Sequence, residues 1–229
     1  MKHITKYDIS ITKWFEGIED KEYSLRYGEN PQQKATAFIN NNMFKQLSGE
    51  KKLSYNNLLD LDAALTITYL TNSNKHICTI VKHNIPCGAS IETSQIKSYT
   101  NALDGDPVSA FGGVVTFNKK VTSLTAKNLL KNFYEVVAAP DFDSEALKIL
   151  KKKVNLRVLK VKKYKVKIEQ RSIFAGMLIQ QANNKKTTIK KVHGINRLNN
   201  EKINFFSNVI KAVKSNAIAI FDQTSLVSQ

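Results

Sequence analysis

Short β-rich runs alternate with longer segments of helical periodicity along most of this chain, and this alternation limits the possible folds most strongly. The expected strands are 76–83, 113–118, 135–140, 155–161, 175–181 and 215–221. The expected helices are 56–70, 90–103, 123–133, 143–153 and 200–213. In the first helix Asn56 or Asn57 is available as N-cap. Strands that alternate with helices favour an α/β layered domain with a largely parallel sheet.

Lys82 and His83 end the apolar run 76–83, and an Asn-Ile-Pro-Cys-Gly segment follows them at once. Ligands of open α/β sheets bind just beyond the carboxyl ends of the strands, so this pair occupies a position typical of a site. Histidine is the usual general base near neutral pH, and a neighbouring lysine can stabilise developing negative charge. The alternative is an ordinary basic pair on the surface.

Three further stretches contain residue types that suit a ligand. Arg26 and Tyr27 precede a Gly-Glu-Asn-Pro turn, and an arginine fork suits phosphate. Gly112 and Gly113 precede a strand and would let the backbone approach a ligand, although no nucleotide fingerprint applies. Asn216 lies between a helix and a strand and could both donate and accept. The alternatives are a solvated arginine, a plain tight turn and an asparagine that tolerates a turn.

The net charge of +16 suggests an anionic partner, but lysine dominates the basic residues. Heavy use of Lys, Asn and Ile is also what an AT-rich genome would favour. The most basic run, 151–167, mixes its charges with Val and Leu at strand-like spacing and contains Tyr164 as its one aromatic residue. A solvated sheet face explains this run, so we do not expect a nucleic-acid partner.

Neither a membrane span nor a secretory signal is expected, because the apolar runs are short and the first residues have no apolar core. Two cysteines, Cys78 and Cys87, form no disulfide framework, so a reducing cytoplasm is expected. His83, Pro86 and Cys87 loosely resemble a zinc deaminase signature. The catalytic glutamate and second cysteine of that signature are missing, and we expect no metal.

Five stretches together resemble the formyltransferase half of the bifunctional purine biosynthesis family PurH. These are LRYGENPQQ, VKHNIPCG, DPVSAFGGVV, EVVAAPDFDSEALKIL and VKSNAIAI. The resemblance runs from about residue 7 to about residue 220. It implies a layered, cytidine-deaminase-like α/β fold without zinc, the first of two such units. It also implies a cytoplasmic homodimer.

The resemblance implies a transferase of purine (IMP) biosynthesis. The formyl group of the co-substrate 10-formyltetrahydrofolate would pass to the 5-amino group of phosphoribosylaminoimidazolecarboxamide (AICAR). By the same resemblance His83 is the general base, Lys82 stabilises charge in the transition state, and Asn216 orients the reacting groups. The resemblance also implies that no metal takes part.

The resemblance also implies how the nucleotide is held. Arg26 and Tyr27 match the family's nucleotide-binding pair, at the phosphate. Gly112 matches a glycine that lines the nucleotide site. Glu135 stands where the family has a carboxylate that faces the ribose hydroxyls.

The resemblance divides the chain into 1–20, a remnant of an inter-domain linker, 21–221, a partial formyltransferase domain, and 222–229, a divergent tail. A cyclohydrolase domain and a second formyltransferase unit are expected to be missing. The chain is therefore expected to be a fragment that is inactive on its own. The alternatives are a non-catalytic remnant and a basic nucleic-acid-binding module.

Overall fold

A mixed six-stranded sheet forms the centre of the molecule in the computed structural model. The structure describes residues 20–40, 42–163, 168–174, 176–183, 189–190, 192–193, 198–213 and 216–229. The expected linker 1–20 therefore lies almost wholly outside the described residues. In spatial order the strands are β3 (Phe44–Ser48), β8 (Arg157–Val161), β7 (Val136–Ala139), β6 (Val114–Phe117), β4 (His76–Lys82) and β5 (Ile85–Glu92).

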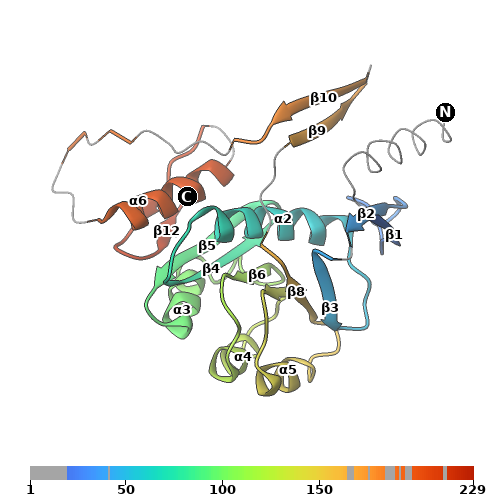
Figure 1. The fold of residues 1–229 in the computed structure, drawn as a ribbon, viewed down its shortest axis with the longest axis horizontal. Helices are drawn as coiled ribbons and strands as arrows, with labels where there is room; N and C mark the ends of the chain where they lie inside the picture. The colour runs from blue at the N-terminus through green and yellow to red at the C-terminus, as the bar shows by residue number, and fades with distance from the viewer. Residues whose placement is uncertain are drawn as a thin grey trace.

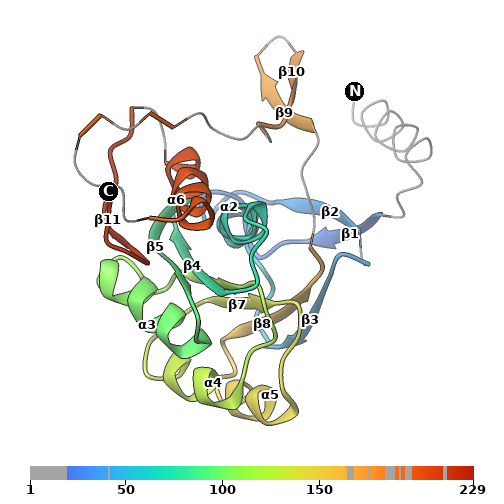
Figure 2. The same cartoon turned by 60° about the vertical axis from the view of Figure 1, so that its left-hand side comes forward.

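Helices cover both faces of this sheet (Figure 1). On one face lie α2 (Tyr55–Leu70) and α6 (Asn200–Ala212); on the other lie α3 (Gln95–Gly105), α4 (Ser123–Leu129) and α5 (Ser144–Leu150) (Figure 2). Alternate residues of the strands therefore enter two separate apolar clusters. Val114 and Val136 belong to the cluster under α2 and α6, whereas Val115 and Val137 belong to the other.

The expectation of a largely parallel sheet is wrong in part. Only β6, β7 and β8 run parallel, whereas β4 is antiparallel to both β5 and β6, and β3 is antiparallel to β8. The expected helix 90–103 began too early, because β5 continues to Glu92 and α3 begins at Gln95. The sequence around Pro86 and Gly88 reads as a turn, but it forms an edge strand, where a proline is tolerated.

A two-residue turn joins β4 to β5. His83 and Asn84 have φ values of 54° and 64°, and positive φ at both central residues is what a type I′ hairpin turn requires. The backbone of α3 packs closely on β5, since a Cβ on Gly88 would lie 2.0 Å from the carbonyl oxygen of Ala102. Glycine at position 88 therefore permits the contact between α3 and this edge strand.

The helix α2 begins with a capping box. Its N-cap is Ser54 rather than Asn56 or Asn57. Ser54 Oγ accepts a hydrogen bond from the backbone N–H of Asn57 (3.1 Å), and Asn57 Oδ1 accepts one from the backbone N–H of Ser54 (3.1 Å). This reciprocal pair fixes the Asn57 side chain at the end of the helix nearest to the starts of β7 and β8.

Three antiparallel ribbons lie outside the main sheet. They are β1 (Asp20–Ser24) with β2 (Thr36–Asn40), β9 (Ile168–Ile173) with β10 (Gly176–Gln181), and β11 (Ile220–Phe221) with β12 (Leu226–Ser228). The ribbon β9–β10 projects away from the layered body in both views (Figures 1 and 2).

Two of these ribbons correspond to expected strands. β10 confirms the strand expected at 175–181, apart from residue 175, which lies outside the described residues. Of the strand expected at 215–221 only the last two residues pair, and they pair with β12 rather than with the main sheet. The proposed boundary at 221–222 therefore falls inside a hairpin, whose Leu226 is buried in the core.

Neither a metal site nor a membrane span is found in the part of the chain that the structure describes. There, no three His, Cys, Asp or Glu side chains come together in a group that could hold a metal ion. No described helix has the length and apolar character needed to cross a bilayer.

Candidate functional site

The reversed direction of β4 brings most of the candidate residues to one end of the sheet. Val81 pairs with Val114, Val114 with Val136, and Val136 with Arg157. Because β4 is antiparallel to β6, the carboxyl end of β4 lies beside the starts of β6, β7 and β8. The strand-end rule therefore applies to β4 but not to the three parallel strands, which contribute their amino ends.

Lys82 and His83 lie at this end, on the hairpin turn. Lys82 Nζ donates a hydrogen bond to the carbonyl oxygen of Phe111 (2.6 Å), which ties it to the loop that carries Gly112. His83 is exposed, so its ring is free to meet a ligand. Its left-handed backbone is an uncommon conformation for a residue other than glycine, and such strain often accompanies a functional site.

Asp60 of α2 holds this turn from beneath. Its Oδ1 accepts a hydrogen bond from the backbone N–H of Asn84 (2.6 Å), and its side chain is buried. Burial raises the pKa of Asp60, while the backbone N–H groups of Asn84 and His83 and the charge of the His83 ring oppose the rise. Sequence reasoning missed Asp60, because an aspartate within a helical pattern gives no local sign that it faces a turn.

Gly112 and Glu135 are joined through the backbone. The N–H of Gly112 donates to the carbonyl oxygen of Phe133 (2.8 Å), and the N–H of Glu135 donates to that of Gly113 (3.0 Å). Gly112 has a φ of 77°, a conformation that favours glycine. The pairing places the Gly112–Gly113 backbone directly beside Glu135.

Glu135 is bound by two side chains that sequence reasoning did not select. Arg157 Nη2 donates to Glu135 Oε2 (2.8 Å) and to Asn57 Oδ1 (2.6 Å), and Asn57 Nδ2 donates to the same Oε2 (2.6 Å). Arg157 was expected on a solvated sheet face, but its side chain is only 2% exposed. The available signal was its position between Leu156 and Val158, in a strand whose other residues are mostly apolar.

Arg26 and Tyr27 are fixed beside the start of α2. The N–H of Arg26 donates to the carbonyl oxygen of Leu53 (2.9 Å), and the carbonyl oxygen of Tyr27 accepts from the N–H of Tyr55 (3.1 Å). The guanidinium carbon of Arg26 lies 4.8 Å from the centre of the Tyr27 ring, within the range of a cation–π contact.

The electrostatics of Arg157 connect this pair to the rest of the cluster. Burial lowers the pKa of Arg157, the carboxylate of Glu135 opposes that effect, and the charge of Arg26 lowers the pKa further. Arg26 and Arg157 are therefore close enough to repel each other, and among the described residues only Arg157 of the two has a carboxylate partner. The charge of Arg26 remains available for an anionic ligand.

Asn216 is the one candidate that no described contact brings to the cluster. It is exposed and lies between α6 and β11, and no hydrogen bond joins it to Arg26, Tyr27, Lys82, His83, Gly112 or Glu135. Its place beside His83 stays a prediction.

A cavity of about 600 Å³ lies next to the Arg26 segment. It is lined by residues of β1, β2 and β3 and the segments beside them: Glu22, Tyr23, Ser24, Leu25, Ile39, Phe44, Lys45, Gln46, Lys52 and Leu53. Its lining includes Leu25 and Leu53, the residues immediately before Arg26 and Ser54.

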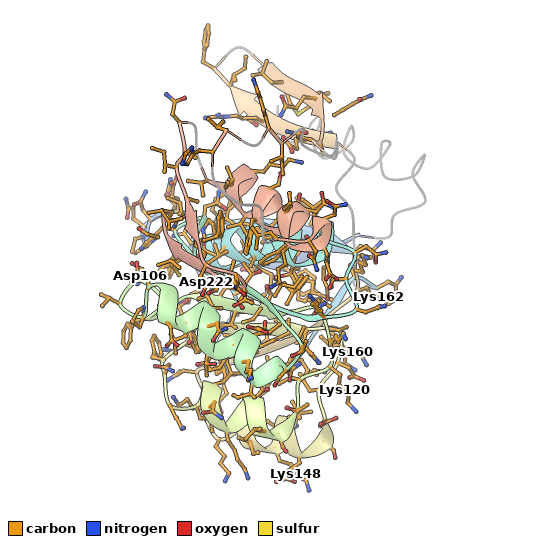
Figure 3. All side chains as sticks on the ribbon, turned by 90° about the vertical axis from the view of Figure 1, so that its left-hand side faces the viewer. Asp106, Lys120, Lys148, Lys160, Lys162 and Asp222 are labelled. Atoms are coloured by element: carbon orange, nitrogen blue, oxygen red, sulfur yellow. The ribbon has the colours of Figure 1, made fainter. Side chains whose placement is uncertain are left out.

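Four surface lysines, Lys120, Lys148, Lys160 and Lys162, lie along one side of the molecule in Figure 3. Several have acidic neighbours: Lys120 lies 2.8 Å from Asp143, and Lys160 lies 3.0 Å from Asp141. Arg157, at the centre of the basic run 151–167, is buried, and residues 164–167 of that run lie outside the described residues. These observations favour a solvated, partly neutralised surface over a nucleic-acid interface.

Comparison with known proteins decides the family. A family model described as the AICARFT/IMPCHase bienzyme matches residues 1–229. The chain belongs to this family. The bifunctional purine biosynthesis protein PurH of Prochlorococcus marinus (strain MIT 9312) is 42% identical over 252 aligned residues, which cover 96% of this chain and 48% of the relative.

A PurH protein from Clostridium botulinum (strain 657 / Type Ba4) is 39% identical and covers 95% of this chain and 47% of its own. The chain thus spans about half the length of the curated AICARFT/IMPCHase relatives that it matches. A crystal structure from Desulfotalea psychrophila, provisionally assigned as a formate dehydrogenase accessory protein, covers 72% of this chain and 87% of its own. It aligns with a TM-score of 0.39 at 8% identity, which is too weak a similarity to indicate a shared fold or function.

Proposed function

We propose that this chain carries the AICAR-binding part of an AICAR formyltransferase. The observation that supports this most is the meeting of Lys82–His83, Gly112 and Glu135 at one end of the sheet, in a chain of the AICARFT/IMPCHase family. These residues come from separate segments of the sequence, and each segment contains a different motif that resembles the family.

The proposed site holds the nucleotide at two points. Arg26, which has no carboxylate partner among the described residues, would bind the phosphate, with the Tyr27 hydroxyl beside it. Glu135 would accept hydrogen bonds from the ribose hydroxyls, and the backbone at Gly112 would line the same region. A ligand bound in this way would present its base toward the hairpin turn of His83.

The proposed reaction begins with the 5-amino group of AICAR, a poor nucleophile because its lone pair is conjugated with the ring. His83 would remove a proton as the nitrogen attacks the formyl carbon of 10-formyltetrahydrofolate. Lys82 would stabilise the resulting oxyanion, and its ammonium group can do so while still donating to Phe111, because it has three N–H donors. The bond from the formyl carbon to N10 of the folate then breaks, and N10 takes the proton from His83.

The same proposal extends to the fold unit, the role of Asn216, the oligomeric state and the folate site. The layered sheet would be the first of two cytidine-deaminase-like units, within a partial domain at 21–221. Asn216 would orient the reacting groups, and the enzyme would act as a homodimer without a metal. The 10-formyltetrahydrofolate would be held largely by residues outside this chain.

Calorimetric titration of the chain with AICAR tests the proposed function. Replacement of Arg26 by alanine should weaken binding at least about tenfold, because a hydrogen bond to a charged group contributes roughly 1.5–3 kcal/mol. Lys148→Ala is the matched control, since Lys148 is an exposed cation on α5 whose partner is Glu145. Absence of AICAR binding, or equal binding by Arg26→Ala and wild type, would contradict the proposal.

A further inference from the structure

The carboxylate of Glu135 is held on one side only. Its Oε2 accepts hydrogen bonds from Arg157 Nη2 (2.8 Å) and Asn57 Nδ2 (2.6 Å), whereas no described residue donates to Oε1. The Glu135 side chain is 30% exposed, while Arg157 is 2% exposed. The buried side of the carboxylate is therefore saturated, and the open side offers one oxygen to a ligand.

The two donors are themselves fixed. Arg157 also donates from Nη1 to the carbonyl oxygen of Asn155 (3.0 Å), and its backbone N–H donates to the carbonyl oxygen of Glu135 (3.1 Å). Asn57 is held by the capping box with Ser54. The contacts of Asn57 define its amide orientation, because Oδ1 accepts from Arg157 and Ser54 while Nδ2 donates to the carboxylate.

This arrangement is a poor device for stability alone. Burial of an arginine costs free energy that an ion pair often fails to recover. In addition, Nε of Arg157 is buried and has no hydrogen-bond partner in the part of the chain that the structure describes, which adds to the cost. A half-buried glutamate could turn its carboxylate to solvent, so the folded state would not require a buried guanidinium beside it. The network is better explained by the orientation that it gives to Glu135.

We propose that Arg157 and Asn57 are positioning residues that lock Glu135, so that its Oε1 selects a ligand carrying a ribose diol over the 2′-deoxy form. The inference rests on the proposed function, because it takes the ligand to be AICAR with its ribose at Glu135. A locked carboxylate pays no entropy of ordering when the ligand binds, so its hydrogen bond to a hydroxyl contributes fully to affinity. Neither residue would touch the ligand.

The test compares the Kd of AICAR with the Kd of its 2′-deoxy analogue, measured by calorimetry on the same chain. Wild type should prefer AICAR at least about tenfold, the scale of one hydrogen bond to a charged group. In Arg157→Lys the preference should fall to about threefold or less, because a lysine cannot reproduce the fork of donors. The Kd of the deoxy analogue should stay unchanged, which a merely structural defect would not achieve.

Two further variants separate the possible outcomes. Lys160→Met, on the same strand but exposed and paired with Asp141, should keep the full preference. The Glu135→Gln variant should lose the preference for AICAR over its 2′-deoxy analogue. A preference that Glu135→Gln abolishes and Arg157→Lys retains would overturn this inference and leave the proposed function standing.

Other results also decide between the two proposals. If Glu135→Gln retains the preference, or if wild type binds neither ligand, the proposed function fails and this inference fails with it. If Arg157→Lys does not fold, Asn57→Ala gives the same test, since it removes one of the two donors to Oε2 and leaves the ion pair. An unchanged preference in folded Asn57→Ala would then overturn the inference.

Discussion

Asp60 Oδ1 accepts a hydrogen bond from the backbone N–H of Asn84 at 2.6 Å, so a buried carboxylate of α2 supports the turn that carries His83. Asp60→Ala should lower the free energy of unfolding by roughly 1.5–3 kcal/mol, the net value of a hydrogen bond to a charged group. Asp60→Asn should retain the bond, because its amide oxygen can accept the same N–H. Urea unfolding measures both, and equal losses in the two variants would show that the bond does not matter.

The raised pKa of Asp60 should make the free energy of unfolding depend on pH. The folded state holds the Asp60 proton more tightly than the unfolded state, whose pKa is near 3.8, because burial disfavours the charged form. Wild type should therefore lose stability relative to Asp60→Asn as the pH rises from below 3.8 through the folded pKa. The stability advantage of Asp60→Asn over wild type should be smallest in acid and constant at pH values above the folded pKa of Asp60. Urea unfolding across the range checks it, and a difference that shrinks as the pH rises would contradict the account.

The left-handed backbone conformation of His83 should lower the stability of the folded protein. His83→Gly should be more stable than His83→Ala by about 1 kcal/mol, because only glycine adopts a φ of 54° without steric cost. Both variants lack the proposed base. Thermal unfolding compares them, and equal midpoints would show that the turn is not strained.

Local patterns predicted most of the elements but not how they meet. The run 76–83 and the run 113–118 could be recognised as buried strands, and their structure confirms them as β4 and β6 with small shifts at the ends. The antiparallel pairing of β4 with β5 depends on the turn at His83 and Asn84, which uses two residues with positive φ in place of the usual glycine. Hydrophobic periodicity does not reveal which residues of a chain adopt positive φ.

The same limit applies to the candidate site. Motif resemblance selected Lys82 and His83, but Arg157 and Asn57 act across sequence separations of 22 and 78 residues from Glu135. A buried ion pair becomes visible only when the strands are in register. Sequence reasoning therefore selected residues whose contact with a ligand stays a prediction, and it missed Arg157 and Asn57, which bond to Glu135.

The ribbon β9–β10 should promote self-association. Its apolar side chains Phe174, Met177, Leu178 and Ile179 are all at least half exposed, and large exposed apolar surfaces mark contact sites. Sedimentation velocity should show species larger than a monomer, and a Phe174→Ser/Leu178→Ser double variant should shift them toward the monomer. Gln170→Ala on the same ribbon is the control. A monomeric wild type would contradict this expectation.

The 229 residues alone should bind AICAR but turn it over too slowly to be useful. Holding both reactants in register can supply about 7–11 kcal/mol of a barrier, and the chain spans about half the length of its relatives. A steady-state assay with AICAR and 10-formyltetrahydrofolate measures this, beside a His83→Ala control. Robust turnover that the control abolishes would contradict the expectation while it supports His83 as the base.

The most direct test of the central claim is a crystal structure of the chain with AICAR bound. We expect the phosphate within hydrogen-bonding distance of the Arg26 guanidinium and the ribose hydroxyls at Glu135 Oε1. We also expect the 5-amino group within reach of the His83 ring. AICAR bound in the cavity that Tyr23 and Phe44 help to line, or with its amino group turned away from His83, would contradict the proposal.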